Sequence, residues 1–132
     1  MGRAWGVAPP ADQDLFGFIR EQLHSVWALE LLLLMRRQPE HHWSEHELVS
    51  ELRASPTLVA NNLAAFERGG LVTADDDGRY YYCPASLLLA ALCNQLDEAY
   101  RERPVKVINA IVAPADKLQT LADAFRIRGD RE

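Results

Sequence analysis

The sequence has only two cysteines in 132 residues, Cys83 and Cys93. Small secreted domains with thin cores are usually held together by several disulfides, so this count excludes a disulfide framework and favours a reducing compartment. Free cysteine mostly packs as a small hydrophobic residue, and we interpret both thiols in this way. A redox role is the alternative that the sequence leaves open.

Long apolar runs are also missing. The run from Leu31 to Met35 is far shorter than the roughly 20 residues that cross a bilayer, and it lies between Glu30 and Arg36. The first residues lack the apolar segment of a signal peptide. Gly6 stands where a myristoylation signal requires Ser or Thr. These absences predict a cytoplasmic protein without membrane contact.

Positive charge is scarce, with 14 Lys and Arg against 19 Asp and Glu and a formal net charge of −5. Attraction to nucleic acid without sequence preference depends on Lys and Arg displacing counterions from phosphate, and this balance weakens it. It does not exclude DNA binding, because the charge of the contacting face decides.

Catalytic motifs are absent as well: the sequence has no glycine-rich phosphate loop, nucleophile elbow or histidine–carboxylate zinc motif. Residues of metal-ligand type gather once, as three histidines and two glutamates: His41, His42, His46, Glu45 and Glu47. They form either a regulatory metal site or a solvated, pH-sensitive loop, and we favour the loop. Asp75 to Asp77 is interpreted as an exposed turn rather than a cation site. We predict no enzyme, no metal and no cofactor.

Helical patterns occupy the first part of the chain. Residues 1–11 have no periodicity and are predicted as a loose tail. One long helix is predicted over 12–37, ended by Gln38-Pro39. Its second half, ALELLLLMRR, is apolar nearly all round and should lie at the centre of the fold. The inward-facing residues of its first half are Leu15, Phe16, Ile19, Leu23, Val26 and Trp27.

Two short helices with strong start signals follow. Ser44 and Glu47 have the spacing of a capping box, which predicts a helix to about Ala54. Ser55-Pro56 opens the next helix with an N-cap residue and a first-turn proline. Gly69-Gly70 ends that helix by supplying the left-handed conformation. About three residues separate the two helices, the spacing of a helix-turn-helix.

A hairpin and further helices complete the pattern. Leu71–Thr73 and Tyr80–Tyr82 read as strands, and Asp75 to Gly78 joins them with the usual Asp-Gly hairpin turn. Helical stretches follow within 86–126, interrupted by Pro104 and Pro114. The fold class is mainly α with a small two-stranded β wing: one winged helix-turn-helix domain over 1–132, with extra N- and C-terminal helices.

The order ALELLLLMRR, then SEHELVSELRASPTLVANNLAAFERGGLV, then a Gly-containing hairpin resembles bacterial winged-helix transcriptional regulators of the MarR-like and ArsR-like type. The resemblance covers about residues 25–82. Its closest signature is the helix with Val59, Leu63 and Phe66, running into Gly69-Gly70. It implies a homodimer that reads two DNA half-sites, with helices outside the motif forming the dimer. The cysteine metal motif of the ArsR-like type is absent.

On a helical wheel, Val59, Leu63 and Phe66 form the core face of the helix from Pro56 to Arg68. Thr57, Asn61 and Arg68 fall on the opposite face, where Asn61 would pair with adenine if this helix enters the major groove. The predicted contacts with double-stranded DNA are Ser55, as the cap, with Thr57, Asn61, Arg68, Arg79 and Tyr80. The alternative is that this face is merely solvated.

Charge in the stretch from Ser44 to Tyr82 opposes DNA binding. It holds three bases, Arg53, Arg68 and Arg79, against seven acids: Glu45, Glu47, Glu51, Glu67, Asp75, Asp76 and Asp77. Arg36, Arg37 and Arg53 are the candidates to add positive charge from neighbouring helices. A winged-helix adaptor that binds another protein is therefore the alternative function.

Apolar residues of the terminal helices predict self-association. Leucines occur on more than one side of the helix that begins after Ser86, which favours a homodimer interface over closure within one chain. The predicted interface residues are Leu15, Phe16, Ile19, Leu88, Leu89, Leu92, Leu96 and Tyr100.

Overall fold

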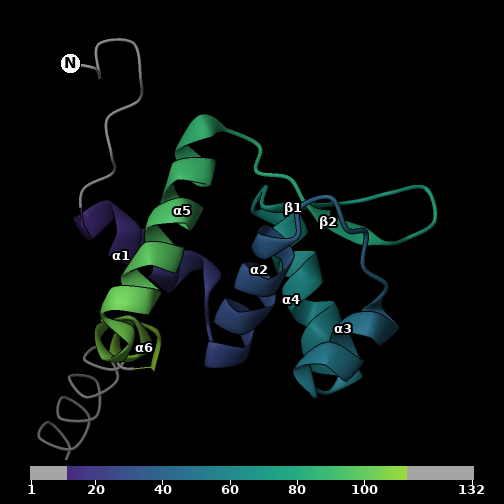
Figure 1. The fold of residues 1–132 in the computed structure, drawn as a ribbon, viewed down its shortest axis with the longest axis horizontal. Coiled ribbons are helices and arrows are strands. Elements are labelled where there is room, and N and C mark those ends of the chain that lie inside the picture. The colour runs from purple at the N-terminus through teal and green to yellow at the C-terminus, as the bar shows by residue number, and fades with distance from the viewer. Residues whose placement is uncertain (1–11, 113–132) are drawn as a thin grey trace, which may run out of the picture.

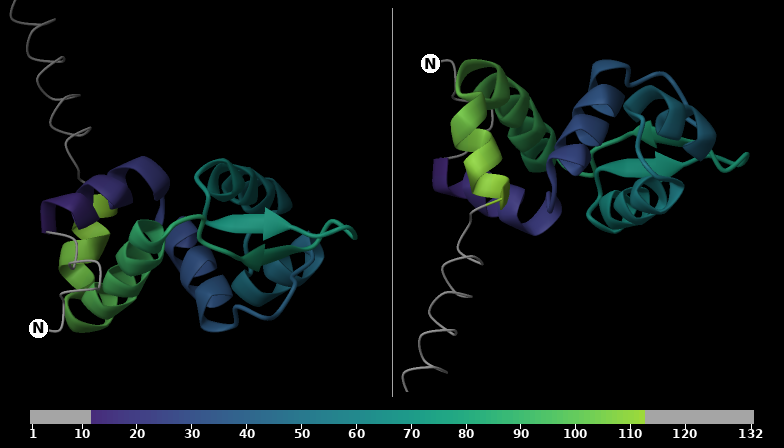
Figure 2. Two further views of the ribbon diagram at one scale, coloured as in Figure 1. Left: turned by 90° about the horizontal axis from the view of Figure 1, so that it is seen from above. Right: turned by 90° about the horizontal axis from the view of Figure 1, so that it is seen from below.

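The computed structural model describes residues 12–112. Within this range the chain forms a helical lobe (α1, α5 and α6) and a winged-helix lobe (α3, α4, β1 and β2), with α2 between them (Figures 1 and 2). The elements are α1 (Asp12–Gln22), α2 (Val26–Arg37), α3 (Glu45–Leu52), α4 (Pro56–Arg68), β1 (Val72–Ala74), β2 (Tyr80–Tyr82), α5 (Leu87–Glu102) and α6 (Pro104–Val112).

The single helix predicted over 12–37 is wrong, because the chain breaks between α1 and α2. Ser25 adopts an extended conformation and its hydroxyl accepts a hydrogen bond of 3.1 Å from the Ala28 N–H, so a new helix is capped there. The apolar spacing continues across the break, and periodicity alone therefore does not reveal it. Trp27, predicted to face inward, is 44% exposed.

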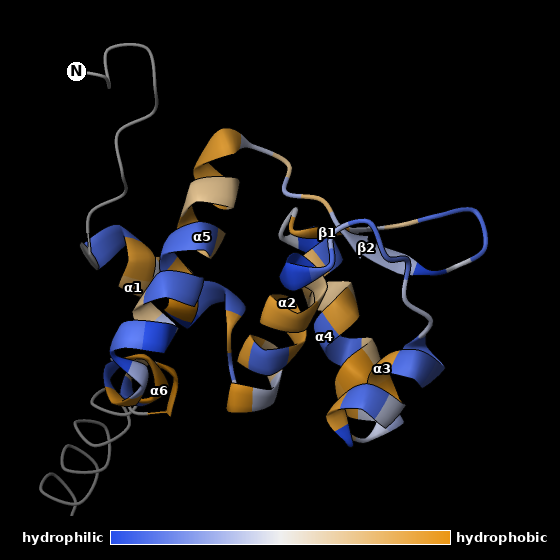
Figure 3. Cartoon of the chain, viewed as in Figure 1, coloured by the Kyte–Doolittle hydropathy of each residue, from blue (hydrophilic) through white to orange (hydrophobic). Residues whose placement is uncertain are grey.

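Helix α2 lies at the centre of the fold, as its sequence predicts. Six of its residues are buried: Ala28, Leu29, Leu31, Leu32, Leu33 and Met35. It packs against α3 and β2 of the winged-helix lobe and against α5 and α6 of the helical lobe. Figure 3 shows its ribbon as largely hydrophobic. Burial of this apolar surface from both sides joins the two lobes into one core.

The capped helices form as predicted. The Ser44 hydroxyl accepts from the Glu47 N–H at 3.0 Å while the Glu47 carboxylate accepts from the Ser44 N–H at 3.1 Å, which completes the capping box of α3. This second bond holds the pKa of Glu47 below its usual value. The Ser55 hydroxyl accepts from the Leu58 N–H at 3.1 Å and caps α4.

Two glycines end α4 for different reasons. Gly70 has φ of +79°, the left-handed conformation that ends helices. Gly69 is right-handed, but a Cβ there would lie 2.5 Å from the Gln22 side chain. The end of the Gln22 side chain would have to move to admit a larger residue there, so the end of α1 lies close against the end of α4.

The wing is a two-stranded antiparallel sheet with Val72 opposite Tyr82 and Ala74 opposite Tyr80. The first strand lies one residue later than predicted. Trp43 extends the sheet through an isolated bridge, with N–H···O bonds to and from Tyr80 of 2.7 and 2.8 Å. The connection between α2 and α3 is thereby tied to the wing.

Helix α5 begins at its predicted cap, Ser86, and α6 begins at Pro104, where the interruption was predicted. The predicted tail over 1–11, the helix over 115–126 and the stretch after it lie outside the described residues. Among the helices of residues 12–112, none is long and apolar enough to span a bilayer.

Candidate nucleic-acid interface

Helix α4 has a buried face and an exposed face. Val59, Leu63 and Phe66 are at most 1% exposed and anchor the helix in the core. Thr57, Asn61 and Arg68, the residues predicted for DNA contact, are all exposed. Half-buried alanines lie between them, so the face is shallow and open to close approach by a large partner.

The turn before α4 adds one cation to this face. Arg53 ends α3 in the left-handed conformation, with φ of +54°, and its side chain is exposed. Ser55 is also exposed, but its hydroxyl already accepts the capping bond from Leu58. Ser55 therefore sets the position of α4 and retains its own O–H as a donor.

A carboxylate organises the turn of the wing. Asp75 Oδ1 accepts hydrogen bonds of 2.9 Å from the Asp77 and Arg79 N–H groups, and Gly78 adopts φ of +80°. Asp76, Asp77 and Arg79 are left exposed at the tip. Figure 3 shows this turn as mostly hydrophilic. The tip thus presents two negative charges beside one positive charge.

Tyr80 is less suited to a phosphate contact than its position in the sequence implies. It is half-buried at the start of β2. Burial raises the pKa of its hydroxyl, and the nearby carboxylates of Glu67 and Glu45 raise it further. Two negative charges around the hydroxyl oppose the approach of an anionic backbone.

Arg36 and Arg37 do not supply charge to the α4 face. Arg36 donates to Asp97 at 2.7 Å and to Asn94 at 2.6 and 3.1 Å, and Arg37 lies 3.5 Å from Asp97. Both arginines are thus held against α5. Of the three candidate cations, Arg53 alone stands next to α4.

The histidines pair with separate carboxylates. His41 Nε2 lies 3.2 Å from Glu47, whereas His42 Nδ1 lies 2.6 Å from Asp75. Within residues 12–112 no three His, Cys, Asp or Glu side chains converge as metal ligands would. The two cysteines differ: Cys83 is exposed, while Cys93 is buried, and burial raises the pKa of its thiol.

The predicted interface residues fall into two groups. Leu15, Ile19 and Leu96 are 0% exposed and Leu92 is 6% exposed, so these four belong to the core of the chain rather than to an intersubunit surface. They are buried because α1 packs on α5 and α6 within one chain. For these four residues the structure supports the alternative interpretation, in which the apolar stripe packs within one chain.

The other four predicted interface residues keep some accessible surface. Leu88 is 50% exposed, while Phe16, Leu89 and Tyr100 are half-buried. Lys106 lies over the Phe16 ring at 5.5 Å, a cation–π distance. Sequence reasoning missed three strongly exposed apolar residues beside them: Leu87 at 74%, Val105 at 68% and Val112 at 53%. The available signals were the three consecutive leucines that begin α5 and the valines at both ends of α6.

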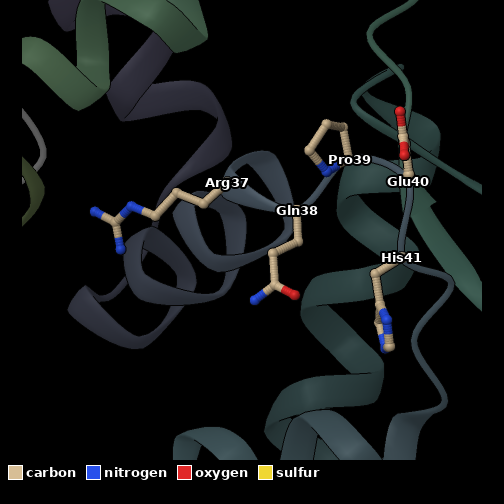
Figure 4. A pocket seen from close by; sticks show the side chains of 5 residues that line it. All are labelled: Arg37, Gln38, Pro39, Glu40 and His41. Carbon is tan, nitrogen blue, oxygen red and sulfur yellow. The ribbon is translucent and has the colours of Figure 1, made fainter.

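Concavities formed by the described residues lie outside the α4 face. One, of about 480 Å³, follows the end of α2 and is lined by residues 37–41; Figure 4 shows the side chains of Arg37, Glu40 and His41 pointing in different directions. Another, of about 440 Å³, lies between α1 and the first turns of α5. Because the polar groups of the first do not converge, it has no evident ligand geometry.

Comparison with known proteins gives the fold. No protein-family model matches the chain, and no curated protein matches it. A solved structure of a mutant of S. aureus MepR, a MarR-family winged-helix regulator, superposes with a TM-score of 0.50 at 12% identity, covering 92% of this chain and 90% of that chain. At this identity the likeness establishes fold alone: the chain has the predicted winged-helix fold, with helices on both sides of the motif.

Proposed function

We propose that the protein is a cytoplasmic transcriptional regulator that binds double-stranded DNA as a homodimer. The fold, shared with a regulator, is consistent with this function but also serves proteins that do not bind DNA. The case therefore rests on the surface of α4.

The supporting observation is the exposed face of α4. Asn61 and Thr57 offer hydrogen-bonding groups to base edges, and Arg68 at the end of the helix offers a cation to phosphate or guanine. The core residues on the other side hold the helix rigidly. Arg53 adds a second exposed cation before the helix, and Arg79 in the wing is the third.

The homodimer is supported by apolar surface on the helical lobe. Leu88 and Val105 are at least half exposed, on α5 and α6. Their contact with a second copy would remove this surface from water, which favours association. The partly accessible Phe16, Leu89 and Tyr100 would lie at the edges of that contact.

A winged-helix adaptor that binds protein is the second candidate function, and the charges near the wing favour it. Arg36 and Arg37 are held by Asp97, and the Tyr80 hydroxyl lies near Glu67 and Glu45. An acidic wing would suit a basic protein partner better than a phosphate backbone.

Enrichment of genomic DNA fragments on the immobilised protein at moderate salt separates the two candidates. We expect the wild type to enrich a defined sequence, and the double variant Asn61→Ala, Arg68→Ala to lose that enrichment while remaining folded. A matched control, Asn109→Ala with Arg101→Ala, removes the same residue types from exposed positions on α6 and α5. If the wild type enriches no sequence, the regulator proposal fails.

A further inference from the structure

A network of polar side chains joins α2 to α5. The Arg36 guanidinium uses all three of its nitrogens: Nε and one terminal nitrogen donate to Asn94 Oδ1 at 3.1 and 2.6 Å, and the other donates to Asp97 Oδ2 at 2.7 Å. Arg37 lies 3.5 Å from the second oxygen of Asp97. Asn94 and Asp97 are three residues apart, on one face of α5.

Asp97 is the charged residue most removed from water in the described range, at 7% exposure. A carboxylate at such a position is costly unless it is paired and hydrogen-bonded. Two arginines from the end of α2 meet this need. The planar fork of Arg36 also constrains direction, which a lysine ammonium would not do.

A second polar contact lies further along the same two helices. The Tyr100 hydroxyl donates a hydrogen bond of 2.8 Å to Glu30 Oε2. Because Arg36 pairs with Asn94 and Asp97 while Glu30 pairs with Tyr100, α2 and α5 run antiparallel, as Figure 1 also shows. The side chains of Arg36, Asn94, Asp97, Glu30 and Tyr100 are hereafter called the α2–α5 seam.

The seam lies where the two lobes meet. Helix α2 packs on α3 and β2 of the winged-helix lobe, whereas α5 packs on α1 and α6. A shift between α2 and α5 would therefore displace α4 relative to the helical lobe. Apolar contacts such as those of buried Leu33 and Leu96 are non-directional, but a fork of hydrogen bonds has one best alignment.

We propose that Asp97, through Arg36 and Arg37, is a positioning residue that fixes the orientation of the winged-helix lobe relative to the helical lobe. In a homodimer joined through the helical lobes, this orientation sets the separation of the two α4 helices. The consequence for DNA binding rests on the proposed function. The orientation of the two lobes within one chain is independent of that function.

The orientation is tested by an electron-spin distance measurement between labels on Glu51→Cys in α3 and Glu102→Cys in α5, both at exposed positions. Cys83→Ser removes the exposed native thiol, and Cys93 is buried. Excess unlabelled protein ensures that each assembly carries labels in one chain only. We expect one narrow distance distribution for this parent protein.

Asp97→Asn in that background should shift or broaden the distribution, with helix content by circular dichroism unchanged. Glu98→Gln is the matched control, since it removes a carboxylate one residue away at an exposed position. A folded Asp97→Asn protein with the parent distribution overturns the proposal, as does an equal change in the control. If Asp97→Asn does not fold, Arg36→Lys, which keeps the charge and loses the fork, decides by the same measurement.

DNA binding supplies the second readout, with duplexes that carry one or two copies of the half-site enriched by the wild type. Asp97→Asn should weaken binding to paired half-sites on the order of tenfold, with little effect on a single half-site. Equal weakening on both duplexes would overturn the positioning role in DNA binding. If the wild type binds no DNA, the proposed function fails, while the distance measurement still decides the role of the seam.

Discussion

His42 Nδ1, in the connection between α2 and α3, lies 2.6 Å from Asp75 Oδ2 at the start of the wing turn. The imidazole also stacks on Tyr81 of β2, with ring centroids 4.3 Å apart and planes within 7°. Asp75 Oδ1 meanwhile accepts from two backbone N–H groups of the turn. One carboxylate therefore closes the hairpin and ties it to the loop before α3.

This arrangement predicts a pH-dependent wing. The His42 side chain and then the Arg79 N–H hold the pKa of Asp75 below its usual value of 3.8. The ionised Asp75 carboxylate therefore contributes its full stabilisation at pH values above 3.8. This stabilisation is lost as the pH falls through the lower pKa of Asp75 in the folded state. The protection of the Asp77 and Arg79 amides from hydrogen exchange, measured relative to their intrinsic rates at each pH, should therefore fall on acidification below about pH 4.

Asp75→Asn should accelerate exchange of the same amides already at neutral pH, and its difference from the wild type should vanish in acid. Asp76→Asn is the control, because Asp76 is exposed at the tip. Equal acceleration in both variants would show that general charge, and not the Asp75 contacts, stabilises the turn.

Local signals in the sequence were sufficient for most of the fold. Ser44 with Glu47, Ser55 with Pro56, and Asp77 with Gly78 each act over four residues or fewer, so their backbone consequences are readable without tertiary context. The break at Ser25 was missed because a serine within a continuing apolar stripe is equally compatible with an unbroken helix.

The candidate site was less predictable because its charges depend on contacts distant in sequence. Arg36 contacts Asn94 and Asp97, some 60 residues later in the chain. The residues around Arg36 in the sequence therefore do not show that its charge is directed toward α5 and not toward α4. Likewise, Leu15 and Leu96 belong to apolar helical stripes, and such a stripe looks the same in the sequence whether it packs against its own chain or against a partner. The helical wheel correctly predicts that Thr57, Asn61 and Arg68 are exposed on α4. Their contact with DNA stays a prediction.

Loss of the α4 cap should lower global stability. Ser55→Ala removes the acceptor of the Leu58 N–H, and we expect the free energy of unfolding to fall by about 0.5–2 kcal/mol. Urea unfolding followed by circular dichroism measures the change. Ser50→Ala, at an exposed position inside α3, is the control and should be close to neutral. Equal effects would mean that the cap contributes nothing beyond a surface hydroxyl.

The two faces of α4 should separate stability from binding. Leu63→Ala opens a cavity at a fully buried position and should cost about 2–5 kcal/mol in urea unfolding. Asn61→Ala, on the exposed face of the same helix, should change stability by less than about 0.5 kcal/mol. A large destabilisation by Asn61→Ala would instead assign that residue a structural role.

Self-association should depend on the exposed residues of the helical lobe. Leu88→Lys and Val105→Lys place charge on apolar surface that is 50% and 68% exposed in the single chain. Burying one such side chain at an interface contributes about 1.5–3 kcal/mol, so the dimer dissociation constant should rise about tenfold or more. Sedimentation equilibrium measures this constant. Glu21→Lys, at an exposed charged position on α1, is the control.

The acidic wing should set the level of DNA affinity without setting its sequence preference. Asp76 and Asp77 are exposed beside Arg79, and like charge near phosphate opposes binding. Asp76→Asn with Asp77→Asn should therefore raise the affinity for specific and unrelated duplexes by a similar factor. The gain should shrink as salt screens the charges. Fluorescence anisotropy titrations at two salt concentrations measure both effects.

Glu98→Gln with Glu102→Gln is the matched control for the wing, because it removes the same charge from exposed positions on α5. If the wing lies against the duplex, the wing variant should gain more affinity than this control. Equal gains would mean that the protein's overall negative charge, and not the wing, limits binding. The wing would then lie away from DNA, and contact would be confined to α4 and the turn that precedes it.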